Sequence, residues 1–142
     1  MASSSSQGDK QASLLLMKQM KQLDKNPVEG FSVGLKDDDN IFLWEVIVIG
    51  PEGTLYEGGM FTLELEFPKT YPNMPPTARF VSKFFHPNVY EDGRVCISIL
   101  HPPGDDEFGY EQANERWLPI HSVESILMSI ISMLRYDSNS IF

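Results

Sequence analysis

The stretch MFTLELEF, residues 60–67, decides the fold. Apolar and polar side chains alternate along it at every second position. The apolar set is Phe61, Leu63, Leu65 and Phe67, and the polar set is Thr62, Glu64 and Glu66. A period of two places successive side chains on opposite faces of an extended strand. We therefore predict a strand in a sheet that buries one face and exposes the other.

Three further stretches have strand character, at residues 31–35, 41–49 and 77–81. The connections between the four predicted strands are short and rich in Gly, Pro and Asp, which are turn-forming residues. Short connections favour pairing of strands that follow one another in the chain. We expect a four-stranded antiparallel meander.

Apolar residues at helical spacing occur both before and after the predicted strands in the sequence. Residues 13–25 carry an apolar stripe, and Asn26-Pro27 follows as a stop signal. A second helix begins at Ser122, a good N-cap. Its apolar stripe contains Val123, Ile126, Leu127, Ile130, Ile131 and Leu134, and leaves out Met128 and Met133. The fold class is α+β: an N-terminal helix, the meander, a long loop and a central helix.

The length of 142 residues suits one domain with a single core. Residues 1–12 are Ser-rich and lack the apolar region of a signal peptide, so we predict a disordered tail before a core at residues 13–142.

Composition excludes several classes of protein. The net charge of −9, with no cluster of cations, argues against nucleic acid binding. No stretch is apolar over the ~20 residues that a membrane span needs. A single cysteine cannot form an internal disulfide, which indicates a reducing compartment. We expect the cytoplasm, with the nucleus and the cytosolic face of the endoplasmic reticulum as alternatives.

Residues 82–121 contain no long periodic run, and this loop region carries the single cysteine, Cys96. Loop regions of this size within a compact domain are usually functional or disordered. A zinc site is disfavoured, because one Cys and three scattered His lack paired ligand spacing. If Cys96 is a nucleophile, its base is one of His86, His101 and His121. His86 precedes a proline, which favours a structural turn role over a role as base.

Acyl exchange with a substrate that is already a thioester requires less of the protein. The amine that then attacks generates an oxyanion, which a carboxamide such as that of Asn88 stabilises. The alternative for Asn88 is an ordinary turn residue. Asp105, Asp106, Glu107 and Glu111 provide carboxylates that assist an incoming amine, and the alternative is a solvated acidic loop.

Three motifs in combination are highly specific: His-Pro-Asn at 86–88, Cys96 eight residues after the Asn, and Trp-Leu-Pro at 117–119. With GPEGTLYEGGMF at 50–61 and PKTYPNMPP at 68–76, the chain resembles the ubiquitin-conjugating enzymes over nearly all of residues 13–134. The segment from His101 to about Asn114 is similar to the acidic insertion of the subgroup that includes yeast enzyme seven and the human G-type enzymes.

The resemblance implies the following roles. Cys96 accepts ubiquitin as a thioester from an activating enzyme, and Asn88 supports the oxyanion or orders the loop. His86 is structural, whereas His101, Asp105 and Asp106 belong to an active-site loop that gates access or positions lysine. The implied binding face for activating enzyme and ligase comprises Lys18, Pro75, Pro76, Leu118, Pro119 and Ile120. The resemblance implies no metal and no cofactor.

Members of the family continue beyond the position of Leu134 with a flap and two further helices, whereas this chain ends in RYDSNSIF. We expect a form that is truncated at the C-terminus. The missing C-terminal part makes one alternative a binding module of the ubiquitin pathway that does not catalyse transfer. A second alternative is a thiol hydrolase that uses Cys96 and a histidine.

Overall fold

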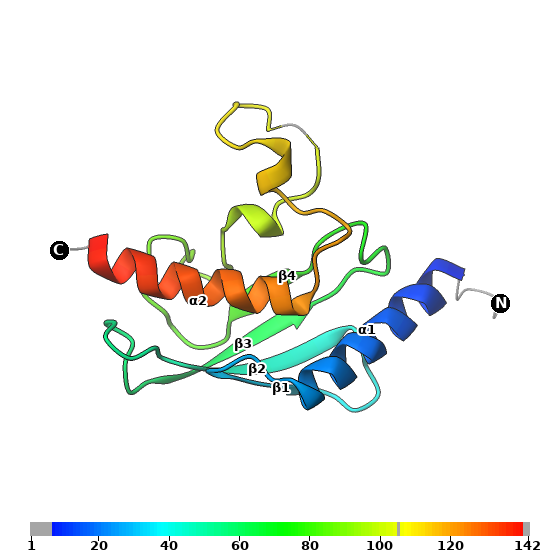
Figure 1. The fold of residues 1–142 in the computed structure, drawn as a ribbon, viewed down its shortest axis with the longest axis horizontal. Coiled ribbons are helices and arrows are strands. Elements are labelled where there is room, and N and C mark those ends of the chain that lie inside the picture. The colour runs from blue at the N-terminus through cyan, green and yellow to red at the C-terminus, as the bar shows by residue number, and fades with distance from the viewer. Residues whose placement is uncertain (1–6, 105, 141–142) are drawn as a thin grey trace.

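A four-stranded antiparallel sheet in the order β1-β2-β3-β4 forms the centre of the computed structural model, which describes residues 7–104 and 106–140 (Figure 1). The strands are β1 (Phe31–Leu35), β2 (Leu43–Ile49), β3 (Met60–Glu66) and β4 (Thr77–Phe80). The predicted meander is confirmed. Strand β2 begins two residues later than predicted, because Asn40 accepts a hydrogen bond from the N–H of Phe42 and holds a turn there.

One face of this sheet is buried, as the alternation in residues 60–67 predicts. In the antiparallel register Trp44 lies opposite Leu65 and Val46 opposite Leu63, and all four side chains are fully buried. Helix α2 (Val123–Ser140) lies across the sheet in Figure 1 and contributes Ile126, Leu127, Ile130 and Leu134 to the same core. Burial of such large apolar side chains is the dominant stabilising contribution in a domain of this size.

The other face of the sheet carries an ion-pair network centred on Glu64. Its carboxylate accepts hydrogen bonds from Lys36 at 2.6 Å and Arg79 at 3.2 Å. The Lys36 hydrogen bond is the main reason why the pKa of Glu64 lies below its usual value. These contacts link β4 and Lys36, the residue that follows β1, to β3 on the exposed side.

Helix α1 spans Gln7–Lys25, so the prediction of a disordered tail through residue 12 is wrong for residues 7–12. The tertiary core explains the earlier start, because Ala12 is fully buried against it. Asp9 also lies in the first turn, where the helix dipole favours an anion. Residues 1–6 lie outside the described residues.

Helix α2 begins one residue after the predicted N-cap, Ser122, and continues to Ser140. Met133, which the predicted apolar stripe left out, is buried at 6% exposure. It follows Ile130 by three residues, a spacing that places both side chains on one helix face. Met128, which the predicted stripe also left out, is exposed at 52%.

Candidate active site

A tight turn at Gly93 attaches the cysteine segment to the free edge of β4. The N–H of Phe80 donates to the carbonyl of Gly93, and the N–H of Val95 donates to that of Ala78. Gly93 has φ +97°, and a Cβ on it would meet the carbonyl oxygen of Phe80 at 2.2 Å. Only glycine fits at this position, and the turn thereby fixes where Cys96 leaves the sheet.

The predicted His-Pro-Asn turn holds the other side of Cys96. The N–H of Cys96 donates to the carbonyl of Asn88 at 2.7 Å, and the N–H of Asn88 donates to Nδ1 of His86 at 2.9 Å. Nε2 of His86 lies 3.1 Å from the carbonyl oxygen of Met133 in α2. His86 is buried and both of its ring nitrogens contact backbone, an arrangement suited to fixing the turn rather than to proton transfer at the sulfur.

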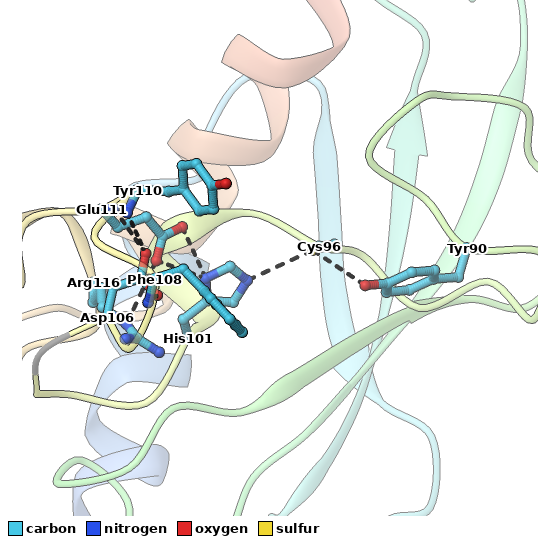
Figure 2. A network of polar contacts seen from close by, with 8 residues as sticks. All are labelled: Tyr90, Cys96, His101, Asp106, Phe108, Tyr110, Glu111 and Arg116. Carbon is cyan, nitrogen blue, oxygen red and sulfur yellow. Dashed lines mark hydrogen bonds and ion pairs between the residues drawn. The ribbon is translucent and has the colours of Figure 1, made fainter.

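His101 is the histidine that reaches the sulfur (Figure 2). Its Nε2 lies 3.6 Å from Sγ of Cys96, and its Nδ1 lies 2.9 Å from both carboxylate oxygens of Glu111. A carboxylate only accepts hydrogen bonds, so Nδ1 carries a proton, and Nε2 faces Sγ. Nε of Arg116 approaches the same carboxylate at 3.5 Å. Thiol, imidazole and carboxylate therefore lie in one row.

Asp106 builds the loop that carries Glu111. Its carboxylate accepts hydrogen bonds from the backbone N–H groups of Phe108, Tyr110 and Glu111. These bonds, the one from Phe108 foremost, lower the pKa of Asp106 from its usual value. Asp106, one of the four carboxylates suggested for an incoming amine, thus also fixes the backbone of its loop. Asp105 lies outside the described residues.

Cys96 and Asn88 line one open groove of about 760 Å³. Its walls come from the loop region, through Ser98, His101, Glu111 and Glu115, and from α2, through Met128, Ser132 and Tyr136. The thiol is partly exposed, and no hydrogen bond of the Asn88 carboxamide is seen within the described residues. The groove has room for an extended peptide whose C-terminus is attached to the Cys96 sulfur, and the Asn88 carboxamide lies in its wall.

The structure also brings together the segments of the implied partner-binding face. Oε1 of Gln19 in α1 accepts hydrogen bonds from the hydroxyl of Tyr71 and from the N–H of Val123. The indole N–H of Trp117 donates to the carbonyl of Pro72 at 2.7 Å. These contacts join α1, the 68–76 loop and the 117–122 loop.

The implied contact residues lie on these three segments and differ in exposure. Lys18, Pro119 and Ile120 are exposed, the last at 86%. Pro75 and Leu118 are half-buried and Pro76 is buried, so Pro76 shapes the loop more than it offers surface.

Two features of the site escaped the sequence analysis. Tyr90 donates its hydroxyl to Sγ of Cys96 at 3.6 Å, and Glu111 pairs with His101. The Asp92-Gly93-Arg94 turn was a signal for the first, since a hairpin centred there brings residue 90 beside the cysteine segment. Nothing in the sequence relates Glu111 to His101, because that contact depends on the path of the loop.

Over the described residues, neither α1 nor α2 has the unbroken apolar length of a bilayer-spanning helix. The same residues contain no group of three or more His, Cys, Asp or Glu side chains arranged to hold a metal ion.

Comparison with known proteins agrees with this geometry. Residues 15–140 match the family described as ubiquitin-conjugating enzyme. The chain is 68% identical to ubiquitin-conjugating enzyme E2 7 of Arabidopsis thaliana over 124 residues, which are 87% of this chain and 75% of the relative. It is 55% identical to human ubiquitin-conjugating enzyme E2 G2 over 119 residues, 84% of this chain and 72% of the relative.

A solved structure, that of human ubiquitin-conjugating enzyme E2 G1, superposes with a TM-score of 0.77 at 55% identity and covers 87% of this chain and 94% of that one. The relatives carry the seven and G-type designations that the acidic insertion suggested. With a matching family, relatives of high identity and a shared fold, the chain belongs to the ubiquitin-conjugating enzyme family.

Proposed function

We propose that Cys96 accepts ubiquitin as a thioester from an activating enzyme and passes it to a lysine of a substrate or of another ubiquitin, with a ubiquitin ligase as partner. In the first step the thiolate attacks the incoming thioester and the activating enzyme's thiolate leaves. In the second, a lysine amine forms a C–N bond, the C–S bond breaks, and the amine's proton passes to solvent.

One observation carries this proposal. Cys96 is partly exposed and lines a groove together with Asn88, whose carboxamide makes no hydrogen bond seen among the described residues. A carboxamide N–H that stabilises an acyl oxyanion contributes roughly 3 kcal/mol in enzymes where single donors have been removed. Asn88 is therefore our candidate for the donor.

For the remaining site residues we propose supporting roles. His86 orders the turn that carries Asn88, and Asp106 shapes the loop over the groove. Lys18, Leu118, Pro119 and Ile120 contribute to the surface that activating enzyme and ligase use in turn, with Pro75 and Pro76 holding the adjacent loop. The protein acts in the cytoplasm in this proposal.

The contacts of His101 favour a second candidate, a thiol hydrolase. Thiol, imidazole and carboxylate in a row have the order of a nucleophile, its base and an orienting group. In a hydrolase water would release the acyl group, whereas in a conjugating enzyme an amine does so.

A single assay separates these functions. The protein is incubated with ubiquitin, activating enzyme and adenosine triphosphate, and analysed with and without thiol reductant. We expect one shifted band that reductant removes, that is absent in Cys96→Ala, and that free lysine discharges faster than buffer alone.

Asn88→Ala, with His86 intact, should form the band and discharge it to lysine about a hundredfold more slowly. No band from folded protein would instead support the binding module. Discharge at equal rates with and without lysine, slowed by His101→Ala, would support the hydrolase.

A further inference from the structure

The side chain of Tyr56 reaches the His-Pro-Asn turn from a loop that is distant in the chain, and the function proposed above gives it no role. Tyr56 lies in the connection between β2 and β3, 29 residues before Phe85. Its hydroxyl donates to the carbonyl oxygen of Phe85 at 2.8 Å. That carbonyl belongs to the peptide bond that leads into His86, so Tyr56 contacts the turn where the turn begins.

Aromatic packing holds the Tyr56 ring. The ring stacks on that of Phe84, with the two centres 4.9 Å apart and the planes at 11°. Phe84 in turn stacks on Phe80 of β4 at 4.0 Å. Phe61 of β3 meets the rings of Tyr56 and Phe84 edge-on. These are the favourable arrangements for aromatic pairs, and they fix the ring to β3 and β4.

Hydrogen bonds hold the backbone of the same residue. The N–H of Tyr56 donates to the hydroxyl oxygen of Thr54 at 3.1 Å, and the N–H of Gly59 donates to the carbonyl of Tyr56 at 3.0 Å. The N–H of Gly50, which follows the last residue of β2, donates to the carbonyl of Gly59 and closes the loop onto the sheet. With ring and backbone both held, the hydroxyl has a defined position.

The Phe85 carbonyl is the first member of a series of contacts that ends at Cys96. A peptide bond is planar, so the direction of this carbonyl also sets the direction of the His86 N–H. Nδ1 of His86 accepts from the N–H of Asn88, and the carbonyl of Asn88 accepts from the N–H of Cys96. The orientation that Tyr56 imposes thus extends to both residues that the proposed reaction uses.

The hydrogen bond from Tyr56 is exposed to solvent, and Phe85 itself is 76% exposed. Without the phenol oxygen, water can satisfy the Phe85 carbonyl, so little stability is lost. Water does not hold the carbonyl in one direction, because water is not attached to the sheet. The hydroxyl therefore contributes more to the geometry of the turn than to the stability of the fold.

We propose that Tyr56 is a positioning residue for the transfer step: its hydroxyl orients the His-Pro-Asn turn, which aims the Asn88 carboxamide at the acyl oxygen on Cys96. The proposal rests on the proposed function for that step. It gives the loop between β2 and β3 a role in the active site, although the described residues that line the groove include none from this loop.

The test removes the phenol oxygen and keeps the ring. Tyr56→Phe preserves the stacking on Phe84, and Tyr110→Phe is the matched control. Tyr110 is 87% exposed, and no hydrogen bond of its hydroxyl is seen among the described residues. Both variants should unfold within about 4 °C of the parent, because a solvent-exposed hydrogen bond contributes little to stability.

The first measurement needs no ubiquitin. Nuclear magnetic resonance of isotope-labelled protein reports the side-chain amide of Asn88, assigned by its loss in Asn88→Ala, and the backbone N–H of Cys96. We expect Tyr56→Phe to shift both signals, because the turn that carries them is reoriented, and Tyr110→Phe to leave them in place. Unshifted signals in folded Tyr56→Phe overturn the proposal.

The second measurement is the rate at which preformed ubiquitin thioester transfers to free lysine, as a function of lysine concentration. Tyr56→Phe should lower the maximal rate about three- to tenfold and leave the apparent KM for lysine unchanged, because the hydroxyl acts on the transition state and not on lysine binding.

A double-mutant cycle separates positioning from a general structural effect. If Tyr56 acts through the Asn88 carboxamide, Tyr56→Phe should have little further effect on transfer in an Asn88→Ala background. An equal loss in both backgrounds, or an unchanged rate in the parent background, overturns the proposal. If the parent forms no thioester at all, the proposed function fails, and the resonance shifts alone decide whether the hydroxyl positions the turn.

Discussion

Replacement of Gln19 tests whether its hydrogen bonds hold the three segments of the implied partner-binding face together. Its side chain is buried, and its single oxygen accepts from the Tyr71 hydroxyl at 2.8 Å and the Val123 N–H at 3.1 Å. Gln19→Leu is similar in size and removes the acceptor from both donors. An unsatisfied buried donor costs about 1–3 kcal/mol, so two cost about 2–6 kcal/mol, which the more apolar leucine offsets by about 1 kcal/mol.

We therefore expect Gln19→Leu to lower the free energy of unfolding by roughly 1–5 kcal/mol. With a urea dependence of about 2 kcal/mol per molar, the midpoint should fall by about 0.5–2.5 M. Unfolding is followed by the fluorescence of Trp44 and Trp117, both fully buried. Gln22→Leu, an exposed position of the same helix, is the control and should change stability by less than about 0.5 kcal/mol.

A double-mutant cycle identifies the cause. Tyr71→Phe alone removes one hydrogen bond, whereas in the Gln19→Leu background it removes a hydroxyl that already lacks a partner. Its cost should therefore shrink by at least about 0.5 kcal/mol in that background. If Gln19→Leu is no more harmful than Gln22→Leu, or if the two changes at 19 and 71 simply add, the reasoning is refuted.

Three further changes have defined outcomes. Burial raises the pKa of Tyr71 to about 12, against 10 in the unfolded chain, so the stability contributed by the protonated phenol is fully present below pH 10 and is lost as pH rises to 12. Urea unfolding at pH 8 and at pH 11 should therefore differ by about 1–2 kcal/mol more in the parent than in Tyr71→Phe. Gly93→Ala should lower the free energy of unfolding by at least about 2 kcal/mol, measured by thermal unfolding. Gly53→Ala, at φ +79° with no atom within 4 Å of the new Cβ, should lower it by about 1 kcal/mol, and equal effects would contradict the close approach of Gly93 to Phe80. For the thiol hydrolase candidate, Glu111→Gln, which alters the group that orients His101, should slow discharge to water about tenfold while exposed Glu107→Gln leaves it unchanged, and equal rates would contradict that role.

Local pattern predicted the sheet well because each strand is a short unit with its own periodicity. The alternation in residues 60–67 gave the buried face, and short connections gave the meander order. The helix ends were harder, since tertiary contacts decide them. Ala12 and Met133 are buried by the assembled core, which the local sequence does not describe.

The candidate site divides in the same way. The His-Pro-Asn turn and the Gly93 turn are local, and they place Asn88 and Cys96 on one groove. His101 and Glu111 meet only because Asp106 gathers three backbone N–H groups and folds the loop back. Asp106 thus shapes the loop, through contacts that the sequence alone did not indicate.

The sequence by itself determined the α+β class, the order of the strands, the single thiol and the family to which the chain belongs. Those properties reside in short-range periodicity, turn residues and motif spacing, which need no knowledge of the rest of the chain. Tertiary structure alone decided which histidine faces the sulfur, that a tyrosine hydroxyl faces it from the other side, and that one glutamine joins three distant segments. The physical reason is that hydrogen bonds reach only about 3 Å, so a contact between residues far apart in the chain exists only after the whole backbone has been placed.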